Sequence, residues 1–310
     1  MKILISESSD FPKDSLVKLS NIGDVYLEGD KYPSKEIDVL FVRLNELIGK
    51  NTHNKFPKLK YIISPTTGTN HIDLTYFNDT NVNIITLKDR LDFLNTVHAT
   101  SEHTIALALA LLRQIPAATK DTLNANWNRY PFKGKELHSS NVLIYGYGRV
   151  GKQVAKLYSS FGCNVKAYDI DNRKIPKKYS CEIESFLPNV DILSLHMDLN
   201  ESNHGIINNE FMEEMSKDSK IVNTSRGELV NQDQLLDKII RRDISGAAID
   251  VLHNEPNPFS SDLIKKIKKC GDRLIITPHI SGFTYESLEK VENHITSIFL
   301  QSIKREKNEK

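Results

Sequence analysis

The chain has 310 residues, which is enough for two domains of ordinary size. Hydrophobic residues make up 39% and charged residues 26%, proportions that fit a soluble globular protein. Lysine and arginine number 41 against 40 aspartates and glutamates, so the formal net charge is +1 and creates no field that would attract nucleic acid.

The chain also lacks the sequence features of membrane, secreted and metal-binding proteins. The longest apolar stretch, residues 105–112, is too short to cross a bilayer, and the N-terminus has no extended apolar region of a secretion signal. The three cysteines, Cys163, Cys181 and Cys270, have no C-x-x-C spacing, which argues against a disulfide framework and a zinc site. We therefore expect no metal, no membrane partner and a reducing, cytoplasmic location.

Short apolar, β-branched runs alternate with helical patterns along almost the whole chain, which predicts parallel sheets with crossover helices. In the first third we expect strands at residues 2–5, 38–42, 61–64 and 83–86. A helical pattern over residues 97–114 is apolar nearly all round, so this helix must be buried between domains or between subunits. Pro116 is predicted to end or bend it, and we place a domain boundary near residue 97.

The strongest motif begins at a strand over residues 141–145. Gly146, Gly148 and Gly151 follow as G-x-G-x-x-G and lead into a helix, and a second strand ends at Asp169. In a dinucleotide-binding unit the first glycine permits a tight turn, the second lets the backbone approach a pyrophosphate, and the third lets helix and strand pack closely. The helix N-terminus then offers N–H groups to the phosphates. The alternative is a glycine-rich turn without a ligand.

Asp169 stands where an acidic residue accepts hydrogen bonds from the ribose hydroxyls. Its charge would repel a 2′-phosphate, which favours NAD over NADP. Arg173 is close in sequence and argues in the opposite direction.

Four more strands are predicted, at residues 190–195, 220–224, 246–250 and 273–277. Arg226, Glu255 and His279 lie in the loops that follow the last three. Ligands of doubly wound sheets bind at the carboxyl ends of strands, so these side chains are expected to converge.

Together, these three side chains suit hydride transfer. The histidine would move a proton on the oxygen of the reacting carbon, the carboxylate would favour the imidazolium and fix its tautomer, and the arginine would grip a substrate carboxylate. Taken alone, Arg226 could be a surface ion-pair partner, Glu255 a loop acid and His279 the end of a strand.

A last helical pattern, residues 287–304, could pack back on the first half of the chain and make that domain discontinuous. The predicted fold is α/β, with two doubly wound parallel-sheet domains. A Rossmann NAD-binding domain, residues 97–284, is inserted into a flavodoxin-like substrate domain made of residues 1–96 plus 285–310.

Over nearly its whole length the chain resembles the D-isomer-specific 2-hydroxyacid dehydrogenases. The matching stretches are "SEHTIALALALLRQIP", "YGYGRVGKQVA", "LSLHMDLNES", "IVNTSRGELVNQDQLL", "AAIDVLHNEP" and "TPHISGFT". The resemblance implies that Arg226, Glu255 and His279 are the catalytic set, and that two copies form a homodimer through the region of the long helix. It also implies that the backbone of Arg149 and Val150 contacts the pyrophosphate of the cofactor. The other implied cofactor contacts are Asp169, Thr224, Ser225, Asp250 and Gly282.

On the substrate side, the resemblance implies a loop, "SPTTGTNHID" at residues 64–73, whose backbone N–H groups hold the substrate carboxylate. The expected contacts are Thr67, Gly68, Thr69 and Asn70. Arg43 falls where some phosphoglycerate dehydrogenases place a phosphate-binding arginine, although the nearby Glu46 would partly offset its pull. Many relatives have glycine at the position of Thr66, and proline is usual at Asp198, which could alter cofactor affinity. The chain also ends too early for the regulatory C-terminal domain of the longer phosphoglycerate dehydrogenases.

The leading hypothesis is an NAD-dependent oxidoreductase that interconverts a D-2-hydroxy acid and its 2-keto acid. A formate-type dehydrogenase is disfavoured, because such enzymes carry glutamine where Glu255 stands. The alternative from another class is a non-enzymatic NAD(H)-sensing, corepressor-like protein of the same fold. Turnover of NADH with a panel of 2-keto acids distinguishes them.

Overall fold

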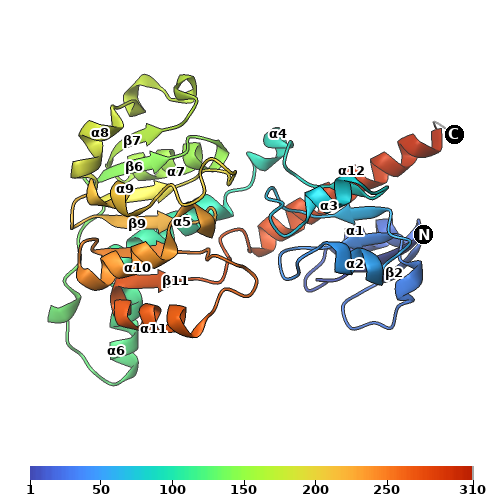
Figure 1. Ribbon diagram of the computed structural model, residues 1–310, viewed down its shortest axis with the longest axis horizontal. Coiled ribbons are helices and arrows are strands. Elements are labelled where there is room, and N and C mark those ends of the chain that lie inside the picture. The colour runs from blue at the N-terminus through green and yellow to red at the C-terminus, as the bar shows by residue number, and fades with distance from the viewer. Residues whose placement is uncertain (309–310) are drawn as a thin grey trace. The chain divides into compact units, whose positions relative to one another are not determined.

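The computed structural model describes residues 1–308 and forms two compact units (Figure 1). Unit 1 consists of Met1–Val97 and Phe283–Lys310, and unit 2 of His98–Gly282. The predicted boundaries at residues 96/97 and 284/285 lie within two residues of these. Residues 309 and 310, the end of the predicted segment 285–310, lie outside the described part of the chain.

The sheet of unit 1 has five parallel strands in the order β2-β1-β3-β4-β5. Their bounds are β1 Lys2–Ile5, β2 Asp24–Tyr26, β3 Val39–Phe41, β4 Tyr61–Ile63 and β5 Asn83–Ile85. Four were predicted. The strand β2 was not predicted, because this short edge strand is only partly buried and carries a weak apolar pattern.

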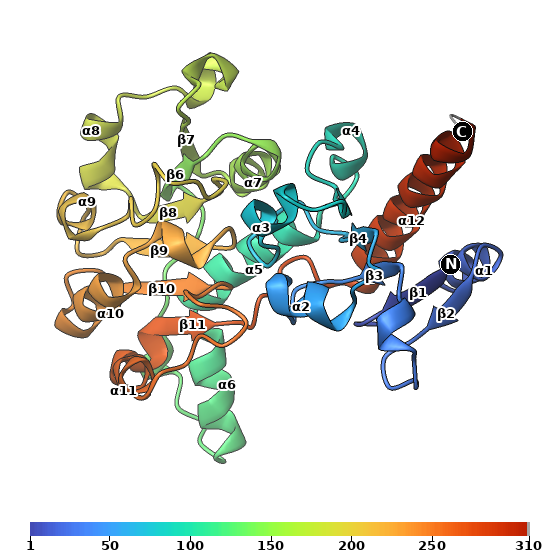
Figure 2. The ribbon, with the colours of Figure 1, turned by 45° about the vertical axis from the view of Figure 1, so that its right-hand side comes forward.

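Helices cover both faces of this sheet (Figure 2). They are α1 Lys13–Ser20, α2 Lys50–Lys55, α3 Leu74–Asn78, α4 Leu91–Leu94 and α12 Tyr285–Asn308, with a short 3-10 turn, η1, at Ser34–Glu36. Since successive strand residues point to opposite faces, Ile3 and Phe41 pack with α1 and α12, whereas Leu4 and Leu40 pack with residues from α3 and the end of α2.

The helix α12 returns the chain to unit 1 after unit 2 is complete. Its Leu288, Ile295, Phe299 and Ile303 are buried at helical spacing. The ring of Phe299 packs edge-on against that of Phe41, with centroids 5.8 Å apart. This apolar stripe explains why a segment so distant in sequence belongs to the N-terminal sheet.

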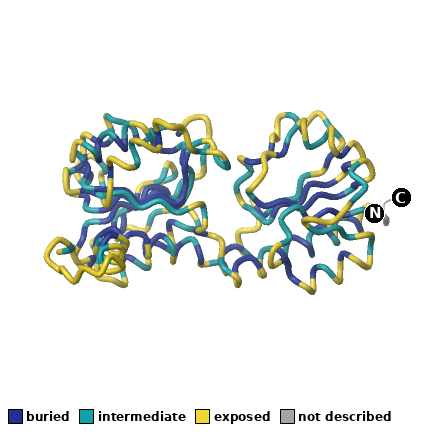
Figure 3. The backbone as a smooth tube through the Cα atoms, turned by 90° about the horizontal axis from the view of Figure 1, so that it is seen from below, coloured by how far each residue is buried: buried dark blue, intermediate teal, exposed yellow. Residues whose placement is uncertain are grey.

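The sheet of unit 2 has six parallel strands in the order β11-β10-β9-β8-β6-β7. Their bounds are β6 Asn141–Tyr145, β7 Asn164–Tyr168, β8 Ile192–Leu195, β9 Lys220–Asn223, β10 Gly246–Ile249 and β11 Leu274–Ile276. All six were predicted. Helices again line both faces, and most of the strands are buried between them (Figure 3).

The helices of unit 2 are α5 Ala99–Leu112, α6 Ile115–Leu123, α7 Arg149–Ser160, α8 Ile183–Phe186, α9 Asn209–Glu213, α10 Gln232–Arg241 and α11 Ser261–Cys270. Short 3-10 turns are η2 Tyr130–Phe132, η3 Asn172–Lys174, η4 Lys177–Tyr179, η5 Leu187–Asn189, η6 Gly227–Leu229 and η7 Gly271–Arg273. Helices α5 and α7 pack on one face of the sheet, and α10 and α11 on the other.

The predicted helix 97–114 is divided differently from the prediction. The helix α5 ends at Leu112, and Gln114 adopts a left-handed conformation with φ of 52° that redirects the chain. Pro116 then lies in the first turn of α6, where its missing N–H costs nothing. The proline therefore helps to begin the next helix, and the break itself falls at Gln114.

No helix of the described residues is long and apolar enough to cross a membrane.

Candidate active site

The loop after β6 is shaped by two glycines that tolerate no side chain. Gly146 has φ of +100°, and a Cβ there would lie 2.6 Å from the carbonyl group of His196. A Cβ on Gly151 would lie 2.0 Å from the carbonyl oxygen of Gly146. The backbone of the strand, loop and helix therefore packs so closely here that no Cβ fits at either glycine. This close packing is what the predicted roles of the two glycines require.

Gly148, by contrast, faces open space. A Cβ at this position would meet nothing within 4 Å. Gly148 is the N-cap of α7 and has no side chain to accept hydrogen bonds from the first turn, which begins with Arg149 and Val150. The positive end of the helix dipole therefore adjoins open space, and this geometry suits the pyrophosphate of a dinucleotide.

Asp169 follows directly on β7 and is held by backbone N–H groups. Its carboxylate accepts hydrogen bonds from Tyr147 N at 2.8 Å and from Asp171 N at 3.0 Å. Arg173, which could have attracted a 2′-phosphate, instead pairs with Asp171, with Nε–Oδ1 and Nη2–Oδ2 distances of 2.7 and 3.2 Å. The site therefore fits unphosphorylated NAD.

The loop after β9 carries three predicted site residues, the cofactor contacts Thr224 and Ser225 and the catalytic Arg226. Thr224 is buried and its hydroxyl lies 2.8 Å from that of Thr104 on α5. Ser225 donates from its backbone N and from its hydroxyl to Asn223 Oδ1, at 3.0 and 2.7 Å. Asn223 Nδ2 in turn donates to the carbonyl oxygen of Arg226 at 2.8 Å, so the backbone of this loop is fixed from within.

Arg226 lies among carboxylates of neighbouring loops. Burial lowers the pKa of its guanidinium, and the negative charges of Asp198, Glu255 and Glu228 oppose that shift. Asp198 acts in the same sense on Arg149, whose pKa burial also lowers. The effect of Asp198 on cofactor affinity stays a prediction. Its negative charge interacts electrostatically with both Arg149 and Arg226.

Glu255 and His279 form a close pair. His279 Nδ1 lies 2.5 Å from Glu255 Oε2, and the other carboxylate oxygen accepts a hydrogen bond from Leu252 N at 2.7 Å. His279 Nε2 has no hydrogen-bond partner among the described residues, and the side chain is 23% exposed. The ring is thus oriented at one nitrogen and accessible at the other, the arrangement that proton transfer needs.

The backbone of His279 is in the left-handed region, with φ of 54°, which is unusual for a residue other than glycine. Its N–H donates to the carbonyl oxygen of Asp250 at 2.8 Å. The Asp250 carboxylate then accepts from Ile280 N at 2.9 Å and Ser281 N at 2.8 Å. The loop ends at Gly282, beside which a Cβ would meet only Thr100 Oγ1, at 4.0 Å.

Asp250 itself is fully buried. Burial by itself would raise the pKa of this carboxyl, but hydrogen bonds from His103, Thr277 and the backbone N–H groups of Ile280 and Ser281 lower it. Thr277 Oγ1 donates to Asp250 Oδ1 at 2.5 Å. Asp250 was predicted as a cofactor contact, and its second role, fixing the His279 loop, was missed.

In unit 1, the predicted substrate loop, residues 64–73, is held by hydroxyl groups. Ser64 Oγ lies 2.9 Å from Thr66 Oγ1 and 3.2 Å from His71 Nε2. Thr66 donates to the carbonyl oxygen of Gly68 at 2.8 Å. The N–H groups of Thr67, Gly68 and Thr69 make no hydrogen bond with the described residues. They remain available to an anion, as predicted for this loop.

Arg43 follows β3, but its guanidinium is engaged within unit 1. Its Nε and Nη2 lie 2.7 and 2.5 Å from Glu292 Oε1, on α12. Burial raises the pKa of Glu292 to about 7, Arg43 opposes the shift, and Glu7 adds to it. Glu292 was not predicted as a site residue, although a charged residue at a core position of the apolar stripe of α12 is a signal that the sequence contains.

His196, which follows β8, is bonded within unit 2. His196 Nε2 lies 2.8 Å from Ser194 Oγ, and burial lowers the pKa of the ring to about 3, so the imidazole is neutral. No group of three or more His, Cys, Asp or Glu side chains within residues 1–308 could hold a metal ion.

Residues 105–281 match the family model of the NAD-binding domain of the D-isomer specific 2-hydroxyacid dehydrogenases. The chain belongs to this family. NAD is accordingly its cofactor, and family and relatives indicate an oxidoreductase acting on 2-hydroxy acids.

Among curated relatives, a glyoxylate reductase of Thermofilum pendens is 29% identical over 298 residues, which cover 93% of this chain and 81% of that protein. A D-3-phosphoglycerate dehydrogenase of Bacillus subtilis is 28% identical over 271 residues, and the match covers 86% of this chain but only 50% of that relative. Among solved structures, the D-lactate dehydrogenase of Aquifex aeolicus, complexed with NAD and lactic acid, has the same fold, with a TM-score of 0.81. It is 24% identical, and the match covers 98% of this chain and 96% of that one.

Replacing Gly151 tests the tight junction of β6 and α7. Gly151→Ala should weaken NADH binding by roughly tenfold or more, because the added Cβ must push α7 away from Gly146 and so displace the N–H groups of its first turn. Titration of NADH fluorescence gives the dissociation constant. Gly49→Ala is the matched control, since a Cβ there meets nothing nearer than 3.5 Å. An unchanged constant for Gly151→Ala would contradict this reading of the loop.

Proposed function

We propose that the protein interconverts a D-2-hydroxy acid and its 2-keto acid, with His279 as the acid and base. The observation that carries this proposal is the Glu255–His279 pair, in which Nδ1 is bonded and Nε2 has no partner among the described residues. Arg226, Glu255 and His279 follow three neighbouring parallel strands, β9, β10 and β11. A base, its orienting carboxylate and a cation therefore share one sheet edge.

In the reducing direction, NADH held by the first turn of α7 and by Asp169 would supply the hydride, and the residues of this chain would manage the proton and the substrate. His279 Nε2 donates its proton to the carbonyl oxygen, and Glu255 stabilises the imidazolium before transfer and fixes the ring afterwards. Arg226 binds the substrate carboxylate through its fork of N–H donors and polarises the carbonyl group. In the oxidising direction the neutral ring takes the proton of the hydroxyl group.

The proposed cofactor contacts are Gly146, Gly148, Arg149, Val150, Gly151, Asp169, Thr224, Ser225, Asp250 and Gly282. The proposed substrate contacts in unit 1 are the N–H groups of Thr67, Gly68 and Thr69, which lack partners among the described residues, together with Asn70. A cytoplasmic location and the absence of nucleic-acid and membrane partners stay predictions.

The proton-transfer role of His279 is tested by His279→Ala with hydroxypyruvate, glyoxylate and pyruvate as substrates. Turnover should fall by roughly 10²- to 10⁴-fold, the usual contribution of general acid–base catalysis, while NADH binding survives. His204→Ala, at an exposed histidine, is the control. Activity like that of the wild type in His279→Ala would refute the assignment. Tight NADH binding by the wild type without turnover of any keto acid would favour an NAD(H) sensor instead.

Asp169→Ala should shift the cofactor preference toward NADP, because the carboxylate that repels a 2′-phosphate is lost. We expect the ratio of kcat/KM for NADPH to that for NADH to rise by about tenfold or more, one lost charge–charge repulsion of about 1.4 kcal/mol. Asp262→Ala, an exposed acid in the first turn of α11, serves as control. An unchanged ratio would count against Asp169 as the selectivity residue.

We also propose a homodimer that forms through the region of α5 and the segment that follows it. That segment exposes large apolar side chains: Leu123 is 82%, Trp127 93% and Tyr130 80% exposed. Such a group of apolar side chains is typical of a surface that another protein covers.

In sedimentation equilibrium the wild type should therefore have about twice the 35.3 kDa mass of the chain. Leu123→Glu should shift it toward the monomer, because a charge would be buried, whereas Val17→Glu, at a 64% exposed position on α1, should not. A monomeric wild type at micromolar concentration would argue against the dimer.

A further inference from the structure

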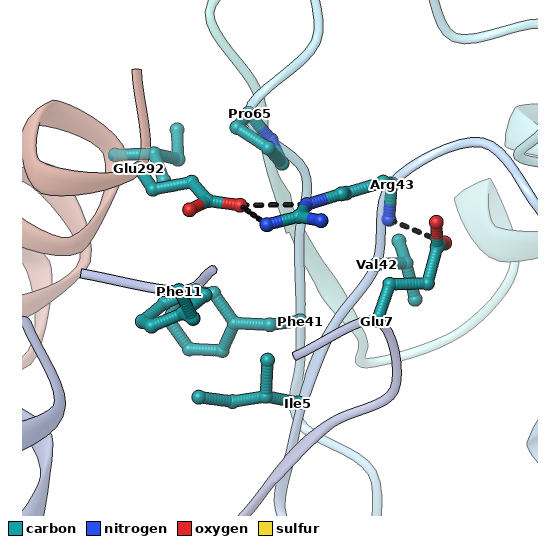
Figure 4. A pocket seen from close by; sticks show the side chains of 9 residues that line it. Ile5, Glu7, Phe11, Phe41, Val42, Arg43, Pro65 and Glu292 are labelled. Atoms are coloured by element: carbon teal, nitrogen blue, oxygen red, sulfur yellow. Dashed lines mark hydrogen bonds and ion pairs between the residues drawn. The ribbon is translucent and has the colours of Figure 1, made fainter. Parts of the chain in front are cut away.

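The pocket around Arg43 lies where a doubly wound sheet usually binds a ligand. In unit 1 the strand order changes direction between β1 and β3, and the crevice at the carboxyl ends of such a strand pair is the usual binding place. Glu7 follows β1 and Arg43 follows β3, and both line a small pocket together with Pro65 and Glu292 (Figure 4).

The guanidinium in this pocket is already occupied. Both Nε and Nη2 of Arg43 point at Glu292 Oε1, and Nη2 also donates to the carbonyl oxygen of Ser9 at 2.8 Å. The side chains of Arg43 and Glu292 are only 10% and 1% exposed. The guanidinium carbon lies 5.9 Å from the centre of the Phe283 ring, which further shields it.

The surroundings of the pair are acidic. Glu7 accepts hydrogen bonds from the backbone N–H groups of Arg43 and Asn45, at 2.8 and 3.3 Å, and its negative charge acts on Glu292, as does that of Asp10. With these carboxylates ionised, three negative charges surround one positive charge. A phosphate dianion would therefore be repelled by the same groups that neutralise Arg43.

Glu292 is also incompletely satisfied. Its Oε2 is buried and has no hydrogen-bond partner among the described residues. A phosphate that replaced Glu292 at Arg43 would leave the whole carboxylate buried and unpaired, which is far more costly than the existing arrangement. The pocket thus presents an acceptor oxygen, the opposite of what a phosphate requires.

We propose that Glu292 holds Arg43 away from substrate phosphates and restricts the enzyme to small, unphosphorylated 2-keto acids. This inference rests on the proposed function and concerns its substrate class. Glu292 is a positioning residue, because it acts through Arg43. It lies 249 positions along the chain from its partner and reaches it only because α12 folds back on the N-terminal sheet.

The test compares hydroxypyruvate with its 3-phosphate ester, which differ only in the phosphate group. Assays run at pH 8, where Glu292 is ionised. The wild type should strongly prefer hydroxypyruvate. Glu292→Gln, which keeps an acceptor for Arg43 but removes the charge, should raise the kcat/KM ratio of ester to hydroxypyruvate by about tenfold or more, mainly through KM of the ester.

Two further variants separate charge from structure. Arg43→Met in the Glu292→Gln background should abolish the gain, because the freed cation is what recruits the phosphate. Glu289→Gln, at an exposed position on the same helix, should leave the ratio unchanged. A wild type that reduces the ester as well as hydroxypyruvate, or a Glu292→Gln ratio equal to that of the wild type, would overturn the proposal.

A binding measurement keeps the test independent of turnover. Inorganic phosphate should raise the Tm of Glu292→Gln at concentrations that leave the wild type and the Arg43→Met/Glu292→Gln variant unchanged. If the wild type reduces neither keto acid, the proposed function fails, and this measurement still decides the role of Glu292. Equal phosphate responses in all three proteins would overturn it.

Discussion

The site in unit 2 depends on one buried carboxylate. Asp250 has no exposed surface, so its charge must be satisfied inside the protein, and the loop after β11 supplies the donors. This loop gives a hydroxyl and two N–H groups, His103 on α5 adds a further donor, and the carbonyl group of Asp250 accepts the N–H of His279. These bonds hold His279 in the left-handed region, a conformation that costs free energy and persists only where its surroundings determine it. Once the backbone is fixed in this way, the ring meets Glu255.

Both units have a change of strand order in their parallel sheet, but different residues lie at that place. In each sheet the strand order changes direction once, between β1 and β3 in unit 1 and between β6 and β8 in unit 2. In unit 2 this place holds Gly148, which leaves open space beside the N-terminus of α7. In unit 1 it holds Arg43, Glu7 and Glu292, whose side chains fill and neutralise it. Parallel sheets provide such a place by topology alone, and the residues there decide whether a ligand can enter.

Apolar periodicity and glycine spacing predicted most of this architecture, because both act locally. Ten of the eleven strands, the nucleotide-binding loop and the order of the polar residues after the strands could be located from the sequence. The edge strand β2 was missed because it is little buried, and the end of α5 was misplaced because a left-handed Gln114 leaves no mark in composition. The Asp250 network and the Arg43–Glu292 pair could not be predicted, since each joins residues that only tertiary packing brings together.

Arg43 and Arg173 were both considered as possible phosphate ligands, and each is paired with an acid, but the two pairs differ in strength. Arg173 is 86% exposed, and a surface pair with Asp171 is easily exchanged for water or for another anion. The discrimination against NADP that we propose therefore rests mainly on Asp169, which two backbone N–H groups fix in place. Arg43 and Glu292 are buried, and separating them leaves a charge without solvent or partner. The proposed exclusion of phosphate in unit 1 therefore rests on the ion pair itself, whereas in unit 2 it rests on the neighbouring carboxylate.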